Sequence, residues 1–266
     1  MKTPAIYVLA LLFVLSSCKK EDQARRPESV ITTIVEADVN TVKNQKEVVK
    51  VYPINHASMI LEYKNEVLYI DPVGGKEVFD TYKAPSIVVI TDVHYDHLDV
   101  PTLEAISNDR LKILAPKAVF EKLSDVLKTK TTVISNGEIK AISKLSLEAI
   151  PMYNLREDAL HFHDKGRGNG YVITFGEQRV YISGDTEDIP EMRALKNIDK
   201  AFVCMNLPWT MPIEKASSAV LEFNPKQIYP YHYRNKDGFS DVAKFKMLIN
   251  ASSDAIEVVQ LDWYKD

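Results

Sequence analysis

The sequence predicts an α/β domain in which β-sheets are covered by helices, and three observations lead to this prediction. Short runs typical of β-strands open the body of the chain at hairpin spacing, with a turn at Lys64-Asn65-Glu66. Residues 86–91 form a continuous, mostly apolar run, which is typical of a strand buried on both faces. Helical and strand-like segments then alternate as far as residue 261, as expected when helices cover sheets.

The individual elements follow from local composition. Runs of β-branched and aromatic residues bounded by turn residues indicate strands, and Gly176-Glu177-Gln178 marks a second hairpin. A proline near the start of each of the first two helices fits there because the first helical turn needs no N–H donor. We expect strands at residues 48–52, 59–62, 67–70, 86–91, 131–135, 145–150, 171–175, 179–182, 200–205, 227–231 and 255–261. We expect helices at residues 101–107, 116–128, 190–195, 214–222 and 240–250.

Composition excludes several classes of protein. The 266 residues include 33 Lys and Arg against 37 Asp and Glu, so the net charge of -4 predicts no nucleic-acid partner. A chain of this length fits one globular domain. The two cysteines, Cys18 and Cys204, lie in very different surroundings, so no disulfide framework is expected. Cys204 follows Ala-Phe-Val in a predicted strand and is expected to be a buried, inert thiol.

The N-terminus has the pattern of a secretory signal. Met1-Lys2 precedes the apolar segment 5–15, which is shorter than the roughly 20 apolar residues that a membrane-spanning helix needs. The segment ends in Leu-Ser-Ser-Cys18, which resembles the lipobox of bacterial lipoproteins, and this implies lipidation of Cys18. The alternative is an ordinary signal peptide with a chance cysteine. Residues 19–45 are polar and charged and are expected to form a flexible tether.

This organisation predicts three parts and a location. Residues 1–18 would be the lipoprotein signal peptide, 19–45 the tether and 46–266 the globular domain. The protein is then expected in the bacterial cell envelope, held to a membrane by its lipid, on the periplasmic or the surface side.

A cluster of potential metal ligands follows the apolar run 86–91. Four imidazole or carboxylate groups fall within six residues, at Asp92, His94, Asp96 and His97. Loops at strand ends are where α/β folds place their sites. Neutral imidazole and carboxylate are also the usual zinc ligands of hydrolytic sites. The sequence therefore predicts a metal site at this strand end.

The segment resembles the T-H-x-H-x-D-H motif of the metallo-β-lactamase superfamily, with Asp92 in place of the first histidine. Three other segments resemble that family's motifs in the same order: Ile70-Asp71-Pro72, Ser183-Gly184-Asp185-Thr186 and Pro230-Tyr231-His232-Tyr233. The resemblance runs from about residue 48 to 266. It implies a four-layer αββα metallo-β-lactamase sandwich and a metal-dependent hydrolase.

One branch of the superfamily is the most similar. It is the lactonase-like and N-acyl phosphatidylethanolamine phospholipase D-like branch. Small archaeal and bacterial members that carry a His-Pro-Lys-Gly segment are similar too, and His163-Asp164-Lys165-Gly166 stands in that place. Residues 206–211, Asn-Leu-Pro-Trp-Thr-Met, resemble a loop of the same group.

The resemblance also implies roles for the residues that match its motifs. His94 would serve a first metal ion, whereas Asp96, His97 and His232 would serve a second. Asp185 would bridge the two ions.

Either His163 or His161 would be the third ligand of the first metal ion. Asp92 has two alternatives as well. It coordinates the first ion directly, or that site is weak and the protein works with one tightly held ion. Asp71 is expected to orient a ligand imidazole through a hydrogen bond.

Three further residues are candidates for contact with substrate or for support of the site: His56, Asn169 and Trp209.

We therefore expect a hydrolase with two divalent metal ions, zinc first, with manganese or iron credible because Asp92 adds a hard carboxylate ligand. A hydroxide shared by the ions would attack an ester, lactone or phosphodiester, with Asp96 and Asp185 as the catalytic carboxylates. The substrate would be a small molecule or a lipid. The main alternative is a non-catalytic envelope binding protein with a degenerate metal site. A diiron redox protein is disfavoured because no added flavin domain is present.

Overall fold

The computed structural model describes residues 47–264. The predicted signal peptide, the tether and Cys18 therefore lie outside the described residues. Within residues 47–264, no helix is both long enough and apolar enough to cross a membrane.

The first sheet has six strands and changes from antiparallel to parallel pairing in its middle. Its order is β1 (Lys50–Asn55), β2 (Ser58–Tyr63), β3 (Glu66–Ile70), β4 (Ile87–Val89), β5 (Lys112–Ala115) and β6 (Thr131–Val133). The pairs β1–β2 and β2–β3 are antiparallel, whereas β3 to β6 pair in parallel. The change of direction at β3 and β4 brings two strands with the same C-terminal edge side by side, which is where α/β sheets hold their ligands.

The second sheet repeats this plan with seven strands. Its order is β15 (Glu257–Val258), β12 (Gln227–Pro230), β11 (Lys200–Val203), β10 (Gln178–Ile182), β9 (Gly168–Phe175), β8 (Leu145–Met152) and β7 (Ile139–Ile142). Strands β7 to β10 are antiparallel, and β10, β11, β12 and β15 pair in parallel. A small hairpin joins β13 (Arg234–Asn235) to β14 (Gly238–Phe239).

Side chains that alternate along the strands build two hydrophobic layers. On β3, Leu68 and Ile70 face the second sheet, whereas Val67 and Tyr69 face the other way, because successive strand residues point to opposite faces. The outer layer of the first sheet is covered by η2 (Lys76–Phe79), α1 (Val100–Ile106), α2 (Lys117–Lys122) and α3 (Asp125–Lys130).

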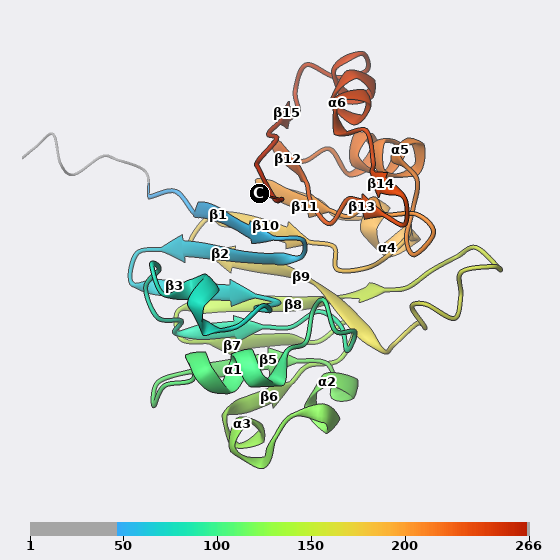
Figure 1. Ribbon diagram of the computed structural model, residues 1–266. Coiled ribbons are helices and arrows are strands. Elements are labelled where there is room, and N and C mark those ends of the chain that lie inside the picture. The colour runs from blue at the N-terminus through green and yellow to red at the C-terminus, as the bar shows by residue number, and fades with distance from the viewer. Residues whose placement is uncertain (1–46, 265–266) are drawn as a thin grey trace, which may run out of the picture. The chain divides into compact units, whose positions relative to one another are not determined.

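The helices α4 (Pro190–Arg193), α5 (Ile213–Phe223) and α6 (Val242–Asn250) cover the second sheet on its other side (Figure 1). Phe223 of α5, for example, meets the ring of Tyr181 of β10 edge-on at 6.0 Å between ring centroids. The arrangement is helix, sheet, sheet, helix, so the predicted αββα sandwich is confirmed.

Several elements differ from the prediction. The single helix expected at 116–128 is two helices, because Leu123 and Ser124 are extended and Leu123 packs into the layer that covers the first sheet. The edge strand β7 and the hairpin β13–β14 were not predicted, since they are short and mostly exposed. Strand β5 was not predicted either, although it is buried inside the first sheet, because it is only four residues long. Strand β4 ends at Val89 instead of residue 91, because Thr91 gives its N–H to the Asp71 carboxylate at 2.7 Å.

Strand β9 approaches the end of β10 closely at Gly170. A methyl group at this position would lie 2.7 Å from the carbonyl oxygen of Ser183 and 3.0 Å from that of Ile182. Both contacts are with backbone, which cannot move aside as a flexible side chain can. Gly170 thus sets the distance between β9 and the segment that leads to Asp185.

We predict that Gly170→Ala lowers the free energy of unfolding by about 1–3 kcal/mol, the usual cost of an overpacked core. Thr174→Ala, at a partly exposed position of the same strand, should change it by less than about 1 kcal/mol. Urea unfolding of both variants measures the difference. Equal effects would mean that Gly170 is not tightly packed.

Candidate metal centre

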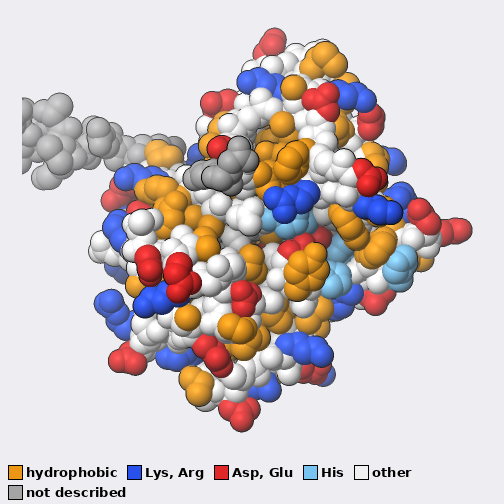
Figure 2. All heavy atoms as spheres, in the orientation of Figure 1, with side chains coloured by type: hydrophobic (Ala, Val, Ile, Leu, Met, Phe, Trp, Pro, Cys, Tyr) orange, Lys and Arg blue, Asp and Glu red, His pale blue; other side chains and the backbone are white. Residues whose placement is uncertain are grey.

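Potential metal ligands meet where strands of the two sheets end. His56 follows β1, Asp71 follows β3, and residues 92–97 lie in the loop after β4. Asp185 follows β10 and His232 follows β12 in the other sheet. Figure 2 shows histidine side chains gathered in a hollow of this face.

The backbone is unusual at three of these strand ends. His56, Asp71 and His232 have φ angles of 54°, 44° and 47°, in the left-handed region that residues other than glycine rarely adopt. Such conformations persist where the surrounding structure imposes them, and they concentrate at functional sites.

Four residues form what we call the main cluster: Asp96, His97, Asp185 and His232. The Nε2 atoms of His97 and His232 lie 3.2 Å apart, and both lie near Asp185 Oδ1, at 3.4 and 3.3 Å. Asp96 completes the group, with Oδ2 3.4 Å from His232 Nε2. A tetrahedral zinc ion with bonds of about 2.0 Å separates its ligand atoms by about 3.3 Å, so the spacings among His97, Asp185 and His232 fit one ion. Asp96 borders this group and also forms a group of potential ligands with His56 and His232.

A buried hydrogen-bond network fixes His97 in the main cluster. Asp71 Oδ2 lies 2.9 Å from His97 Nδ1, and the same oxygen accepts the Thr91 hydroxyl at 2.6 Å. Asp71 and His97 are both fully buried. Since a carboxylate accepts the Nδ1 proton, the Nε2 lone pair of His97 faces Asp185. Such partners of a ligand imidazole set its tautomer and its orientation.

The main cluster gathers carboxylates with which no Lys or Arg side chain of the described residues pairs. Asp185 Oδ1 is buried and accepts no hydrogen bond from the described residues. Burial alone would raise the pKa of Asp185, but the imidazoles of His232 and His97 hold it well below its usual value. Burial opposes charge on His97 as well, yet the carboxylates of Asp185, Asp96 and Asp71 raise the pKa of His97 well above its usual value. The negative potential there is what a divalent ion would neutralise, so these residues fit a metal ion.

A second group, which we call the side cluster, consists of Asp92, His94 and His163. His163 Nδ1 lies 3.2 Å from the carbonyl oxygen of Trp209, so it carries the proton and turns Nε2 toward the cluster. That Nε2 lies 3.3 Å from Asp185 Oδ2 and 4.0 Å from Asp92 Oδ2. Asp185 thus faces the main cluster with one oxygen and the side cluster with the other.

Arg167 pairs with the side cluster's carboxylate. Its Nε lies 3.2 Å from Asp92 Oδ1, and its Nη2 lies 3.0 Å from Asp92 Oδ2. His94 Nδ1 lies only 2.7 Å from the same Oδ2, which is a hydrogen-bond distance and shorter than the spacing of ligands around one ion. Burial alone would raise the pKa of Asp92, but His94, His97 and Arg167 lower it to about 2. The side cluster therefore fits a metal ion less well than the main cluster.

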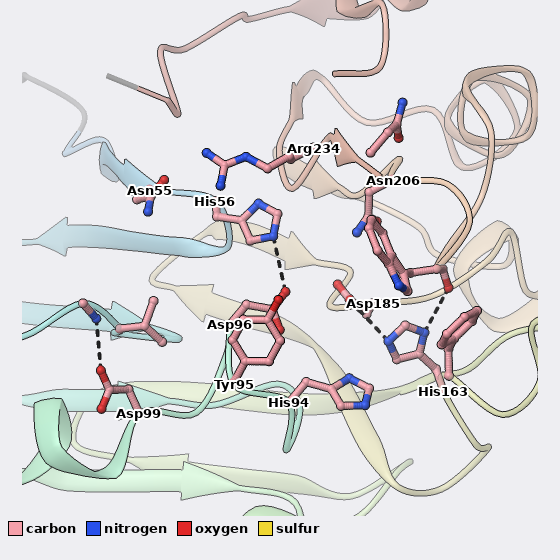
Figure 3. A pocket seen from close by; sticks show the side chains of 15 residues that line it. Asn55, His56, His94, Tyr95, Asp96, Asp99, His163, Asp185, Asn206 and Arg234 are labelled. Carbon is pink, nitrogen blue, oxygen red and sulfur yellow. Dashed lines mark hydrogen bonds and ion pairs between the residues drawn. The ribbon is translucent and has the colours of Figure 1, made fainter. Parts of the chain in front are cut away.

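A pocket of about 490 Å³ opens onto both clusters. In Figure 3, His56 and Asp96 face each other on one side, and Asp185 points toward His163 on the other. His56 Nε2 lies 3.3 Å from Asp96 Oδ2, and its Nδ1 lies 2.8 Å from the Tyr264 hydroxyl. The other lining residues include Asn55, Tyr95, Phe162, Asn206, Trp209, Arg234 and Asn235.

The structure separates the two histidines that were open as a third ligand. His163 is buried beside Asp92 and Asp185, whereas His161 is exposed and stacks on Phe162 with ring centroids 4.1 Å apart. Only one residue separates them in the chain, in a segment of turns, and of the two only His163 is buried toward the clusters.

Two other predicted residues also lie in different places. Trp209 lines the pocket, and its carbonyl orients His163. Asn169 does not line the pocket, because its amide group donates to the carbonyl of Ile134 at 2.8 Å and to the hydroxyl of Tyr171 at 3.1 Å. Of the two roles open for Asn169, these contacts favour support of the site, since its backbone N–H also donates to the carbonyl oxygen of Thr91 at 2.9 Å. Cys204 is buried, and burial raises the pKa of its thiol to about 12.

Sequence reasoning missed four residues that shape the site: Thr91, Arg167, Arg234 and Tyr264. Thr91 is the first residue of the segment that resembles T-H-x-H-x-D-H, and Arg167 directly follows the segment His163-Asp164-Lys165-Gly166. Arg234 and Tyr264 gave no signal, because their contacts with the pocket depend on the path of the chain after β12.

Comparisons with known proteins agree with this geometry. A UPF0173 metal-dependent hydrolase of Pyrococcus horikoshii is 25% identical over 219 residues, which cover 78% of this chain and 95% of that protein. A Methanosarcina mazei protein of the same name is 26% identical over 220 residues, covering 79% and 94%. Igni18, a metallo hydrolase of Ignicoccus hospitalis, has a similar fold, with a TM-score of 0.68, 21% identity and coverage of 82% and 96%.

A bacterial protein of known structure is more similar in sequence. This Parabacteroides distasonis protein, assigned as a metal-dependent hydrolase, is 36% identical, with a TM-score of 0.71 and coverage of 80% of this chain and 92% of that one. Residues 70–233, more than half of the chain, match the family described as the β-lactamase superfamily domain. The chain therefore belongs to the metallo-β-lactamase superfamily, among relatives named metal-dependent hydrolases.

Proposed function

We propose that this protein hydrolyses a small ester, lactone or phosphodiester at a metal ion held by the main cluster. One observation carries the proposal. Asp185 Oδ1 is buried without a hydrogen bond between the Nε2 atoms of His97 and His232, and Asp185 also lines the pocket. Two imidazoles and two carboxylates are typical ligands of zinc, so we propose zinc before manganese or iron.

A bound zinc ion would supply an activated water as nucleophile and would polarise the substrate oxygen. The chain's own residues position the reactants. Asp96 lines the pocket, and although burial alone would raise its pKa, the imidazoles of His97, His232 and His56 lower it, so it stays an ionised acceptor for a proton from water. His56 contacts Asp96 inside the pocket, and the hydroxyl of Tyr264 in turn fixes the ring of His56.

The mouth of the pocket supports a substrate with an anionic group. Arg234 lines the pocket and is exposed, and its guanidinium lies 4.6 Å from the centroid of the Tyr264 ring. No carboxylate of the described residues forms an ion pair with it. Three amide side chains, Asn55, Asn206 and Asn235, line the same pocket. We therefore favour a phosphodiester or a carboxylated lactone, in line with the resemblance to the lactonase-like and phospholipase D-like branch.

We further propose that the protein is a lipoprotein of the bacterial cell envelope, attached to a membrane through Cys18. The support is the sequence alone: a short apolar segment that ends in Leu-Ser-Ser-Cys18, followed by a charged tether. A lipid substrate would then be close at hand, although the anchor by itself does not select one.

The function is tested with neutral and anionic nitrophenyl esters and phosphodiesters as substrates. We expect His97→Ala to lower kcat/KM at least about 100-fold, because a metal's contribution to catalysis is worth several kcal/mol. His161→Ala is the matched control and should leave kcat/KM unchanged, since His161 is an exposed histidine. Bound metal without hydrolysis of any substrate class would instead favour a binding protein.

Asp71→Asn tests the support of His97 without removing a ligand. We expect the affinity for zinc to fall about 10–100-fold, the usual cost of losing such a partner. Asp99→Asn serves as the control, because Asp99 caps α1 and accepts the N–H of Thr102 outside the cluster. Competition with a chelator measures both affinities. Equal zinc affinity in both variants and the wild type would contradict the role of Asp71.

The anchor is tested by metabolic labelling with an alkyne fatty acid in a bacterial host. Cys18→Ser should abolish labelling and move the protein from the membrane to the soluble fraction. Cys204→Ser removes the only other cysteine and should change neither result. Label retained in Cys18→Ser would exclude Cys18 as the lipid attachment site.

A further inference from the structure

We propose that Arg167 takes the place of a second metal ion in this chain, so that the main cluster holds one ion and the side cluster holds none. The inference rests on the proposed function, because it concerns the same site. It makes Arg167 a positioning residue that neutralises Asp92 permanently.

Arg167 donates hydrogen bonds to both carboxylate oxygens of Asp92. The guanidinium binds both carboxylate oxygens, at 3.2 and 3.0 Å, and Asp92 is fully buried. Its Nη2 also donates to the carbonyl oxygen of Phe162 at 2.6 Å, so backbone holds the group from a second direction. Bidentate pairs of this kind are short, strong and geometrically specific.

His94 belongs to the same network. Its Nδ1 faces Asp92 Oδ2 at 2.7 Å, and its Nε2 lies 3.4 Å from Arg167 Nη2. Because the two N–H groups of Arg167 Nη2 already serve Asp92 Oδ2 and the carbonyl oxygen of Phe162, the firm contact of His94 is the one through Nδ1. An ion bound there would have to displace these contacts, and it would lie close to a guanidinium, which does not lose its charge in proteins.

The main cluster shows the opposite condition. Its central oxygen, Asp185 Oδ1, accepts no hydrogen bond, and no guanidinium of the described residues pairs with Asp96 or Asp185. A guanidinium thus pairs with the carboxylate of the side cluster, whereas none of the described residues offers one to the carboxylates of the main cluster.

The backbone at Gly168 lies close enough to Asp92 for the Asp92–Arg167 pair to form. Gly168 follows Arg167, and a methyl group on it would lie 2.9 Å from the carbonyl oxygen of Thr91 and 3.2 Å from Asp92 Oδ1. Only a residue without a side chain lets β9 start this close to Asp92, and this closeness brings Arg167 within reach. Asp92 is also the one position at which the chain departs from the family motif.

The experiment counts zinc per chain by elemental analysis, on full-length protein loaded with excess zinc and passed through a desalting column. We expect about one zinc ion in the wild type and about none in His97→Ala. Arg167→Met keeps the length of the side chain without its charge and should raise the content to about two, because Asp92, His94 and His163 become available. Arg156→Met is the control and should retain one, since Arg156 pairs with Glu187 outside the clusters.

His94→Ala keeps the test decisive if Arg167→Met does not fold, and circular dichroism shows whether it does. The zinc content of His94→Ala should equal that of the wild type, because His94 binds no ion. Two zinc ions in the wild type, with one lost in His94→Ala, would overturn the inference and leave the proposed function intact. One zinc ion in both the wild type and a folded Arg167→Met would overturn the role of Arg167. No zinc in the wild type would overturn the proposed function itself.

Discussion

The buried carboxylate of Asp71 is the constraint on which the site depends. It accepts hydrogen bonds from the N–H and the hydroxyl of Thr91 and contacts His97 Nδ1, while its backbone N–H donates to Val89. Because of those contacts, strand β4 ends before Thr91 and the loop of residues 92–97 begins there. They also orient His97 so that its Nε2 faces Asp185. Burying an ionisable group without partners costs several kcal/mol. The hydrogen bonds of Asp71 offset that cost. They also fix the backbone at Thr91, where the loop after β4 begins.

The two sheets contribute unequal halves of one centre. The loop after β4 provides Asp92, His94, Asp96 and His97, whereas the second sheet contributes Asp185, His232 and, from the loop before β9, His163. Asp185 faces both clusters, with one carboxylate oxygen toward each. Because both sheets change from antiparallel to parallel pairing, each offers strand ends at the same edge, and the centre forms where these edges meet.

Several features of the fold and the site were predictable from the sequence, because motifs and strand periodicity depend on residues close together in the chain. The fold class, most strands and the loop of Asp92 to His97 needed only residues that are neighbours in the chain. The Asp92–Arg167 pair joins positions 75 residues apart, and the carbonyl of Trp209 reaches His163 across 46 residues. Such contacts follow from the path of the backbone, which composition does not encode. The break between α2 and α3 was missed for the same reason, since packing of Leu123 overrode local helix propensity.

The placement of ligands on both sheets has a consequence for the whole domain. An ion held by His97 from one sheet and by Asp185 and His232 from the other would act as a cross-link between the sheets, much as a disulfide does. Because an unfolded chain does not keep these groups together, binding energy becomes folding energy. At free zinc about 100 times its dissociation constant, this linkage adds about 2.7 kcal/mol. The melting temperature of the protein would then report the zinc available in its compartment.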